Sequence, residues 1–225
     1  MLRVARLIAA KDLRIELRSR VVTNQVLPFA AIVMVMFAFA FNTDSVVQKV
    51  APGLVWLATL FSLLTLVQRS FAVETADGAT DALRGAGVDP AGIFLGKAIA
   101  LAAQLAVLEL VLLFTAVVLY SAEFRLSGLV LLVTTFVAAT CGLALVGTLY
   151  GGLAAGVRGR ETLLPLLLLP VVAPVLIGAT RATEAALGTG GAVVADGWSW
   201  VGLLTVFVAL FGVGGTLAFG PLIEE

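Results

Sequence analysis

The stretch AIALAAQLAVLELVLLFTAVVLY, residues 98–120, decides the fold class of this chain. It contains a single charged side chain, Glu109, and about 20 apolar residues are enough for an α-helix to cross the hydrocarbon core of a bilayer. A helix is the expected structure, because inside a bilayer every backbone N–H and C=O must be satisfied within the segment. The sequence therefore predicts a transmembrane helix here.

Five further stretches share this character, and together they predict an all-α polytopic membrane protein. The 225-residue chain is 61% hydrophobic and 12% charged, against about 25% charged residues in soluble domains. Apolar residues do not alternate with a period of two, so a transmembrane β-barrel is excluded. We expect one transmembrane domain over residues 1–225. Its six spans are expected at about 21–43, 50–68, 98–120, 126–150, 162–180 and 199–221.

The composition also excludes several functions. Histidine is absent, which removes the commonest general base, the commonest transition-metal ligand and the usual proximal ligand of haem iron. The net charge is zero, so nucleic acid is excluded as a partner, because binding its phosphates needs a basic surface. Cys141 and Tyr150 could act as nucleophiles, yet no titratable base is suitably placed near them in the sequence. We therefore predict a non-catalytic chain that binds no metal or cofactor directly.

The distribution of lysine and arginine predicts the orientation in the membrane. Of the 14 basic residues, eleven fall in segments on one side of the six spans and three fall on the other side. Because basic side chains resist translocation, both termini are expected in the cytoplasm. Residues 181–197 then form an extracytoplasmic loop, and Trp198 and Trp200 lie where an interfacial aromatic belt is expected. The three basic residues on the extracytoplasmic side are Lys49, Arg125 and Arg181.

Residues 1–20 are expected to form a cytoplasmic helix lying along the membrane surface. The segment mixes apolar with basic residues and carries Glu16 four residues before Arg20, a pair that supports a helix. The alternative is a flexible basic tail. The segment is too long and too mixed in charge for the start of a signal peptide, so we expect no cleavage after the small residues at 38–40.

The most polar region is the cytoplasmic connection over residues 69–97. Its middle is compatible with a short helix that ends at Gly85 and Gly87, before Asp89-Pro90 starts the next helix. Such a helix is either a docking site for a soluble partner or part of a solvated connector. The glycine pair lacks the rest of a phosphate-binding fingerprint, so any nucleotide must be bound by another chain. The candidate docking residues are Glu74, Asp77, Asp81, Leu83 and Arg84.

Glu109 is the one charged residue near the middle of a span. An ionised carboxylate is costly there unless it faces the bundle interior, finds a partner or is protonated. Two interpretations stay open: a role in gating or subunit contact, and a structural hydrogen bond to a neighbouring helix. No carboxylate or histidine partner is evident in the other spans, which argues against a proton relay.

Proline and glycine mark two unusual spans. Pro165, Pro170 and Pro174 remove helix hydrogen bonds from the fifth span and are expected to kink or break it. That helix either lines a path or a lateral groove, or is a kinked structural helix. In the fourth span, GxxxG spacings at 147–151 and 152–156 allow close helix approach, either within the chain or between two copies.

Several segments, in the same order and across essentially the whole chain, resemble the CcmB family. Each segment alone is weak, but their combination is specific. The resemblance rests on KDLRIELRSR at 11–20, APGLVW at 51–56, QRSFAVE at 68–74, FLGK at 94–97, LEL at 108–110, LLPLLLLP at 163–170 with Pro174, and EE at 224–225.

The CcmB family is the membrane subunit of the ABC transporter in cytochrome c maturation. The resemblance implies an ABC-2 exporter-type permease in a bacterial inner membrane, present in two copies. It implies as partners a cytoplasmic ATPase subunit, which binds the ATP, haem-handling membrane subunits of the same pathway, and membrane lipid. In such exporters the connection between the second and third spans carries a coupling helix that docks on the ATPase, and this feature falls on residues 74–84 here.

The resemblance leaves the cargo open. It implies either haem export or a mechanical role, in which ATP hydrolysis releases a haem-loaded chaperone from a neighbouring haem-binding subunit. Without histidine, the chain would have to guide haem by apolar contacts, which favours the mechanical role. The alternative from another class is a non-transporting scaffold that assembles haem-handling subunits in the membrane.

Overall fold

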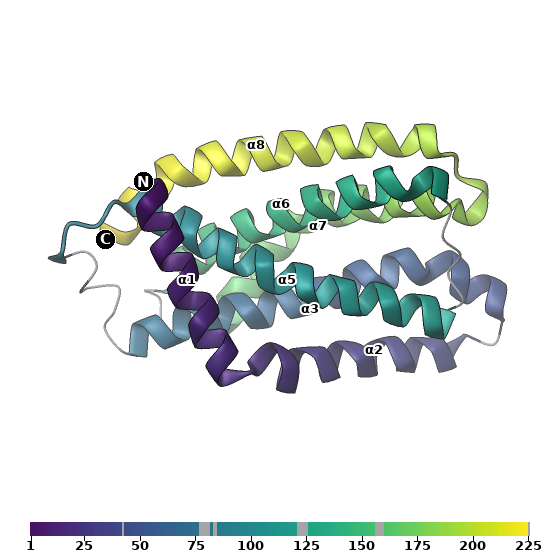
Figure 1. Ribbon diagram of the computed structural model, residues 1–225, viewed down its shortest axis with the longest axis horizontal. Helices are drawn as coiled ribbons and strands as arrows, with labels where there is room; N and C mark the ends of the chain where they lie inside the picture. Colours follow the sequence, from purple (N-terminus) through teal and green to yellow (C-terminus); the bar gives the residue numbers. More distant parts are fainter. Residues whose placement is uncertain (42, 77–81, 83–84, 121–125, 156–159, 225) are drawn as a thin grey trace.

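The computed structural model of the chain describes residues 1–41, 43–76, 82, 85–120, 126–155 and 160–224. Six long helices form an elongated bundle, and a shorter helix, α1, lies across one end of it (Figure 1). Both chain termini lie at that same end. The helices are α1 (Leu2–Ser19), α2 (Leu27–Ala40), α3 (Asp44–Ala76), α5 (Pro90–Tyr120), α6 (Leu129–Ala155), α7 (Arg160–Leu187) and α8 (Val194–Glu224).

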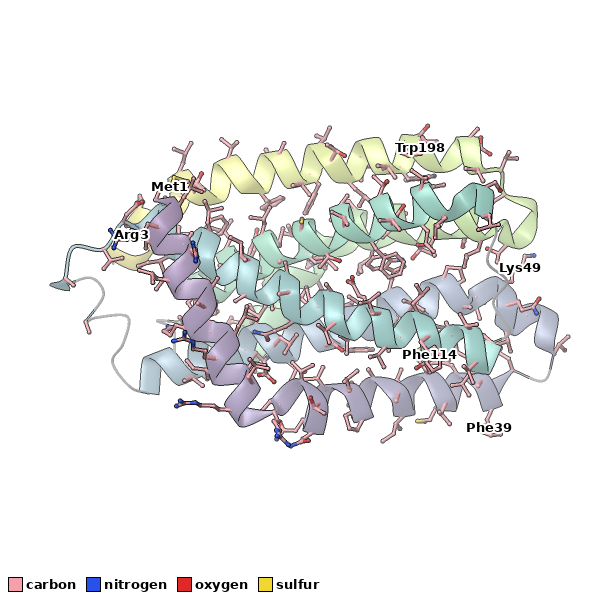
Figure 2. The ribbon with its side chains drawn as sticks, viewed as in Figure 1. Met1, Arg3, Phe39, Lys49, Phe114 and Trp198 are labelled. Carbon is pink, nitrogen blue, oxygen red and sulfur yellow. The ribbon has the colours of Figure 1, made fainter. Side chains whose placement is uncertain are left out.

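Among the described residues, six helical segments are long and apolar enough to cross a membrane, which confirms the predicted fold class. The outer surface of the bundle is apolar as well: the side chains of Phe39 and Phe114, which are 83% and 70% exposed, lie on its outside (Figure 2). An extended apolar surface of this kind is suited to lipid and not to water. The segments are Val22–Ala40, Val46–Val73, Pro90–Tyr120, Leu126–Ala155, Thr162–Leu187 and Val194–Leu222.

The connection between α3 and α5 is shorter than the predicted 69–97. Helix α3 continues to Ala76 and α5 begins at Pro90, so only residues 77–89 lie between them. With 33 residues, α3 is about 50 Å long, against about 30 Å of hydrocarbon. A helix satisfies its own backbone hydrogen bonds, and it can therefore continue past the first charged residue into the headgroup region and water.

The loop predicted over 181–197 is also shorter than expected. Helix α7 continues to Leu187 and α8 begins at Val194. Buried alanines in the last turns of α7 form one cluster with Leu131 of α6, and this packing keeps the segment helical. Gly188 then ends the helix with a φ of 69°, a conformation that glycine adopts without steric cost.

The core lies where α3 and α6 pack together. Helix α6 contacts α3, α5, α7 and α8, and α3 also contacts α2, α5 and α7. Trp56 of α3 is fully buried, and its ring centroid lies 4.9 Å from that of Phe136 on α6. Its Nε1–H donates to Oγ1 of Thr183 on α7 at 3.0 Å. One side chain therefore connects three helices.

Glycines of α6 allow this close packing. A Cβ at Gly147 would lie 2.9 Å from Cγ2 of Val67 on α3, and a Cβ at Gly151 would overlap the ring of Phe71, also on α3. The first of the two GxxxG spacings therefore serves packing within the chain. The second extends outside the described residues.

The chain turns from α1 into α2 at a corner built around Glu16. Arg20 adopts a left-handed φ of 52°, and its N–H donates to the carbonyl of Glu16. The carboxylate of Glu16 accepts the N–H of Val22 at 2.6 Å. A wide π-helical turn follows, just before Pro28, whose missing N–H leaves a carbonyl of that turn without its usual donor. The corner places α1 across the end of the bundle.

Candidate functional site

The connection that carries the predicted docking residues leaves the bundle from α3 and returns to it in α5. Glu74 lies near the C-terminus of α3. Asp77, Asp81, Leu83 and Arg84 lie outside the described residues, and their role stays a prediction. What the structure describes is how both ends of the connection are held.

A buried lysine links the two ends of the connection to α1. Lys97 of α5 is 3% exposed, and its Nζ lies 3.4 Å from Oδ2 of Asp12 on α1. The same Nζ donates to Oγ of Ser70 on α3 at 3.3 Å and lies 4.6 Å from the ring centroid of Phe71. We call Asp12, Ser70, Phe71 and Lys97 the Lys97 cluster.

The charges in the Lys97 cluster are balanced. Asp12 is 9% exposed and accepts Lys97 on one carboxylate oxygen, while the other lies 3.1 Å from Nζ of Lys11. A buried charge costs several kcal/mol unless it is paired and hydrogen-bonded. The ammonium group of Lys97 has a carboxylate, a hydroxyl and an aromatic face around it, and these contacts offset the cost of its burial.

Helix α1 sits on α5 through two glycines. A Cβ at Gly96 would lie 2.6 Å from the carbonyl oxygen of Ala5 and 2.7 Å from Cβ of Ile8. A Cβ at Gly92 would lie 2.8 Å from Cβ of Val4. Only glycine permits this approach, so the α1–α5 contact depends on residues that lie one helical turn apart and next to Lys97.

Asp89 caps the N-terminus of α5. Its Oδ1 accepts the N–H of Ala91 at 3.2 Å, an N-cap interaction before Pro90. Its Oδ2 lies 3.3 Å from the amino group of Met1. Together with the Lys97 cluster, this contact holds α1 against the point where the connection re-enters the bundle.

Sequence reasoning missed the Lys97 cluster. From the sequence, Lys97 was counted only among the basic residues that predict orientation. Asp12 was noted only as part of a segment that resembles the CcmB family. The two residues are 85 positions apart, and no local pattern pairs them. The available signal was that both lie inside the segments on which the family resemblance rests.

Glu109 contacts a neighbouring helix. It is 2% exposed, and its Oε2 lies 2.5 Å from Oγ1 of Thr140 on α6. Within the described part of the chain, its Oε1 is buried without a hydrogen-bond partner. This geometry agrees with a structural hydrogen bond between α5 and α6, whereas a role in gating or subunit contact stays a prediction.

A lateral groove runs between α5 and α6 beside Glu109. Its volume is about 500 Å³. Ala102, Ala103 and Ala106 line it on the α5 side, and their small side chains leave the space that the groove occupies. Besides Glu109, its polar lining residues are Thr140 and Cys141.

The three prolines do not break the fifth span. Pro165, Pro170 and Pro174 all lie inside α7, which is helical from Arg160 to Leu187. The buried leucines and valines around them recur every three or four residues, as on a helix with one face on the core: Leu164, Leu168, Val172 and Val175. A kink at these prolines, and a path along them, stay predictions.

Side chains able to bind a metal do not gather in the described residues, where no three His, Cys, Asp or Glu side chains lie together. Met34 is fully buried and Met36 is 67% exposed, so the two thioethers face different directions. The part of the chain that the structure describes thus presents no paired thioether site for haem iron.

The chain is similar to known proteins over almost its whole length. A family model described as "CcmB protein" matches residues 3–221. Heme exporter protein B of Haemophilus influenzae is 30% identical over 204 residues, which cover 88% of this chain and 91% of that protein. The protein of the same name from Pseudomonas aeruginosa is 30% identical over 190 residues, 83% of each chain.

Proposed function

The chain belongs to the CcmB protein family, and from this premise we propose that it is the membrane permease subunit of an ABC transporter for cytochrome c biogenesis. It is a multi-pass membrane protein, and its relatives are named for heme export. In this proposal a cytoplasmic partner subunit binds and hydrolyses ATP, and this chain, paired with a second copy, moves its helices in response.

The Lys97 cluster is the observation that supports coupling through the connection between α3 and α5. Residues 74–84 follow Ser70 and Phe71 of α3 in the chain and precede Lys97 of α5. A force that an ATPase applies to them therefore acts on both helices close to the Lys97 cluster. Since the Nζ of Lys97 contacts Ser70, Phe71 and Asp12, the two helices and α1 move as one body. Motion at the connection is therefore transmitted to the bundle and is not lost in independent bending of each helix.

The orientation belongs to the same proposal. Met1 and Arg3 lie at one end of the bundle and Lys49 lies at the other (Figure 2). Most basic residues fall in the segments at the end of the bundle where Met1 lies, and the positive-inside rule therefore predicts that this end, with the connection, faces the cytoplasm. A cytoplasmic ATPase can reach the connection only in this orientation.

We favour release of a haem-loaded chaperone over passage of haem through the chain. The sequence contains no histidine, so a haem route would depend on apolar contacts. A mechanical role needs only a connection that receives force and helices that transmit it to a neighbouring haem-binding subunit.

The test is co-expression with a candidate ATPase subunit and haem-handling membrane subunits from the same organism, followed by purification and assay of ATP hydrolysis. We expect a stoichiometric ATPase subunit, whose coupled activity is lost in Asp81→Ala and Leu83→Ala while the complex stays intact. Ala86→Ser, a conservative change in the same connection, is the matched control and keeps full activity.

Two results would overturn this proposal. A stable membrane complex that contains no ATPase subunit leaves the scaffold function standing. Full ATPase activity and full cytochrome maturation in both Asp81→Ala and Leu83→Ala would show that coupling does not use this segment.

A further inference from the structure

The hydroxyl of Thr140 has two oxygen atoms within hydrogen-bond distance, and one of them belongs to Glu109. Oγ1 of Thr140 lies 2.6 Å from the carbonyl oxygen of Phe136 and 2.5 Å from Oε2 of Glu109. A hydroxyl has one proton to donate, and a carbonyl oxygen can only accept. Both contacts are satisfied at once when the hydroxyl donates to Phe136 and a protonated Oε2 of Glu109 donates to the hydroxyl, and we adopt this assignment.

A neutral carboxyl group also suits this position in the membrane, where an ionised one is costly. The remaining oxygen, Oε1, is then a carbonyl-type acceptor with no donor in the described residues. A buried acceptor without a donor is unfavourable. A neutral hydrogen-bond donor next to Oε1 would therefore satisfy this group.

The groove between α5 and α6 offers a route for such a donor. Leu110, Val133 and Val137 line it and are each more than half exposed on the outer surface of the bundle. The groove thus opens sideways, toward the acyl chains of the membrane and not toward water. Oε1 itself is covered by neighbouring side chains, and a ligand hydroxyl would reach it by displacing them while Oε2 keeps its contact with Thr140.

We propose that this groove binds a neutral lipophilic alcohol from the membrane, with its apolar chain between α5 and α6 and its hydroxyl donating to Glu109. A groove of about 500 Å³ lies within the usual range of small-molecule sites, which are mostly apolar with a few placed polar groups. A charged headgroup does not fit, because the lining supplies no counter-charge. This site is independent of the ATPase coupling proposed above.

Two photoprobes test the proposal. One is dodecan-1-ol with a mid-chain diazirine, and the other is its methyl ether, which has the same chain but no donor. The full-length chain is reconstituted in phosphatidylethanolamine and phosphatidylglycerol vesicles, irradiated with either probe, and mapped by peptide mass spectrometry. We expect the alcohol to label α5 and α6 around Glu109 about fivefold more than the ether does, the ratio expected for one net hydrogen bond.

Three variants sharpen the test, each first checked for folding by size-exclusion chromatography. Glu109→Gln keeps a neutral acceptor and a donor to Thr140, and is expected to keep the preference for the alcohol. Glu109→Leu removes the acceptor and is expected to label equally with both probes. Ala106→Phe fills the groove and is expected to lose the labelling.

Equal labelling of the native chain by the two probes would overturn the proposal, as would undiminished labelling of Ala106→Phe. The same experiment on native membranes, with the partner subunits present, addresses a competing occupant. Loss of labelling there, with labelling kept in vesicles made from the lipids of the same membranes, would show that a transmembrane helix of a partner fills the groove, and would likewise overturn binding of a free alcohol.

Discussion

Lys97 is a buried basic residue near the start of α5. Its contacts with Asp12, Ser70 and Phe71 join three helices at the end of the bundle where the chain begins. A buried ion pair is weak evidence for stability, since apolar residues can replace it, but removing one partner alone is costly. Replacing only Lys97 or only Asp12 should therefore lower the stability of the protein.

We expect Lys97→Met to lower the melting temperature of the purified full-length chain. Asp12 would remain buried with Lys11 as its remaining cation, so the loss should be about 1–3 kcal/mol, below the value for a carboxylate left without any partner. The measurement is thermal unfolding in detergent, followed by tryptophan fluorescence.

Lys49→Met is the matched control, because Lys49 is exposed at the opposite end of the bundle (Figure 2). Adding Asp12→Asn to Lys97→Met should restore part of the loss, as expected for two residues that interact directly. Equal melting temperatures for Lys97→Met and Lys49→Met would contradict the role assigned to the cluster.

At the scale of elements, the position of α1 depends on small residues of α5. It contacts α5 extensively, although its own sequence is basic and only partly apolar. The contact is possible because Gly92 and Gly96 bring the two backbones close together. The membrane-surface position predicted for residues 1–20 is compatible with this placement across the bundle end.

We expect Gly96→Ala to detach or shift α1. The new Cβ would meet the carbonyl oxygen of Ala5 at 2.6 Å, and backbone cannot yield as a flexible side chain does, so the cost should be about 1–3 kcal/mol. Limited proteolysis of reconstituted protein should cut within α1 several-fold faster than in the native chain.

Gly202→Ala is the control for this substitution, because a Cβ at Gly202 meets nothing within 4 Å. Its proteolysis rate should match that of the native chain. Comparable cleavage of α1 in Gly96→Ala and Gly202→Ala would show that the close approach of α1 to α5 is not what holds α1 in place.

For the whole molecule, the orientation in the membrane is the property that decides which end meets an ATPase. Both termini lie at one end (Figure 1), and the basic residues predict that this end is cytoplasmic. The same prediction puts the short segment between α7 and α8 on the outside.

Cysteine labelling tests this orientation. In a Cys141→Ala background, which removes the one native cysteine, Val193→Cys should react with a membrane-impermeant maleimide in intact spheroplasts. Ala86→Cys, in the connection between α3 and α5, should react only after permeabilisation. Both side chains are exposed in the structure, so the reversed pattern of labelling would overturn the orientation.

The fold class and the number of spans could be predicted because they depend on local properties. A membrane span is a sum over about 20 consecutive residues, and all six predicted spans are present in the structure. Their ends were less predictable: α3 and α7 continue beyond the predicted limits, because the hydrocarbon thickness limits the apolar segment and not the helix.

The sequence by itself therefore determined the class of the protein, its six spans and the family to which it belongs. Only the tertiary structure decided the partners of Lys97 and Glu109. Lys97 contacts Asp12, 85 positions away, and Glu109 contacts Thr140, 31 positions away. The physical reason is that lipid-facing and core-facing residues of these helices are equally apolar. Periodicity then does not distinguish the buried face of a helix, and contacts follow from how the helices are rotated and tilted against one another.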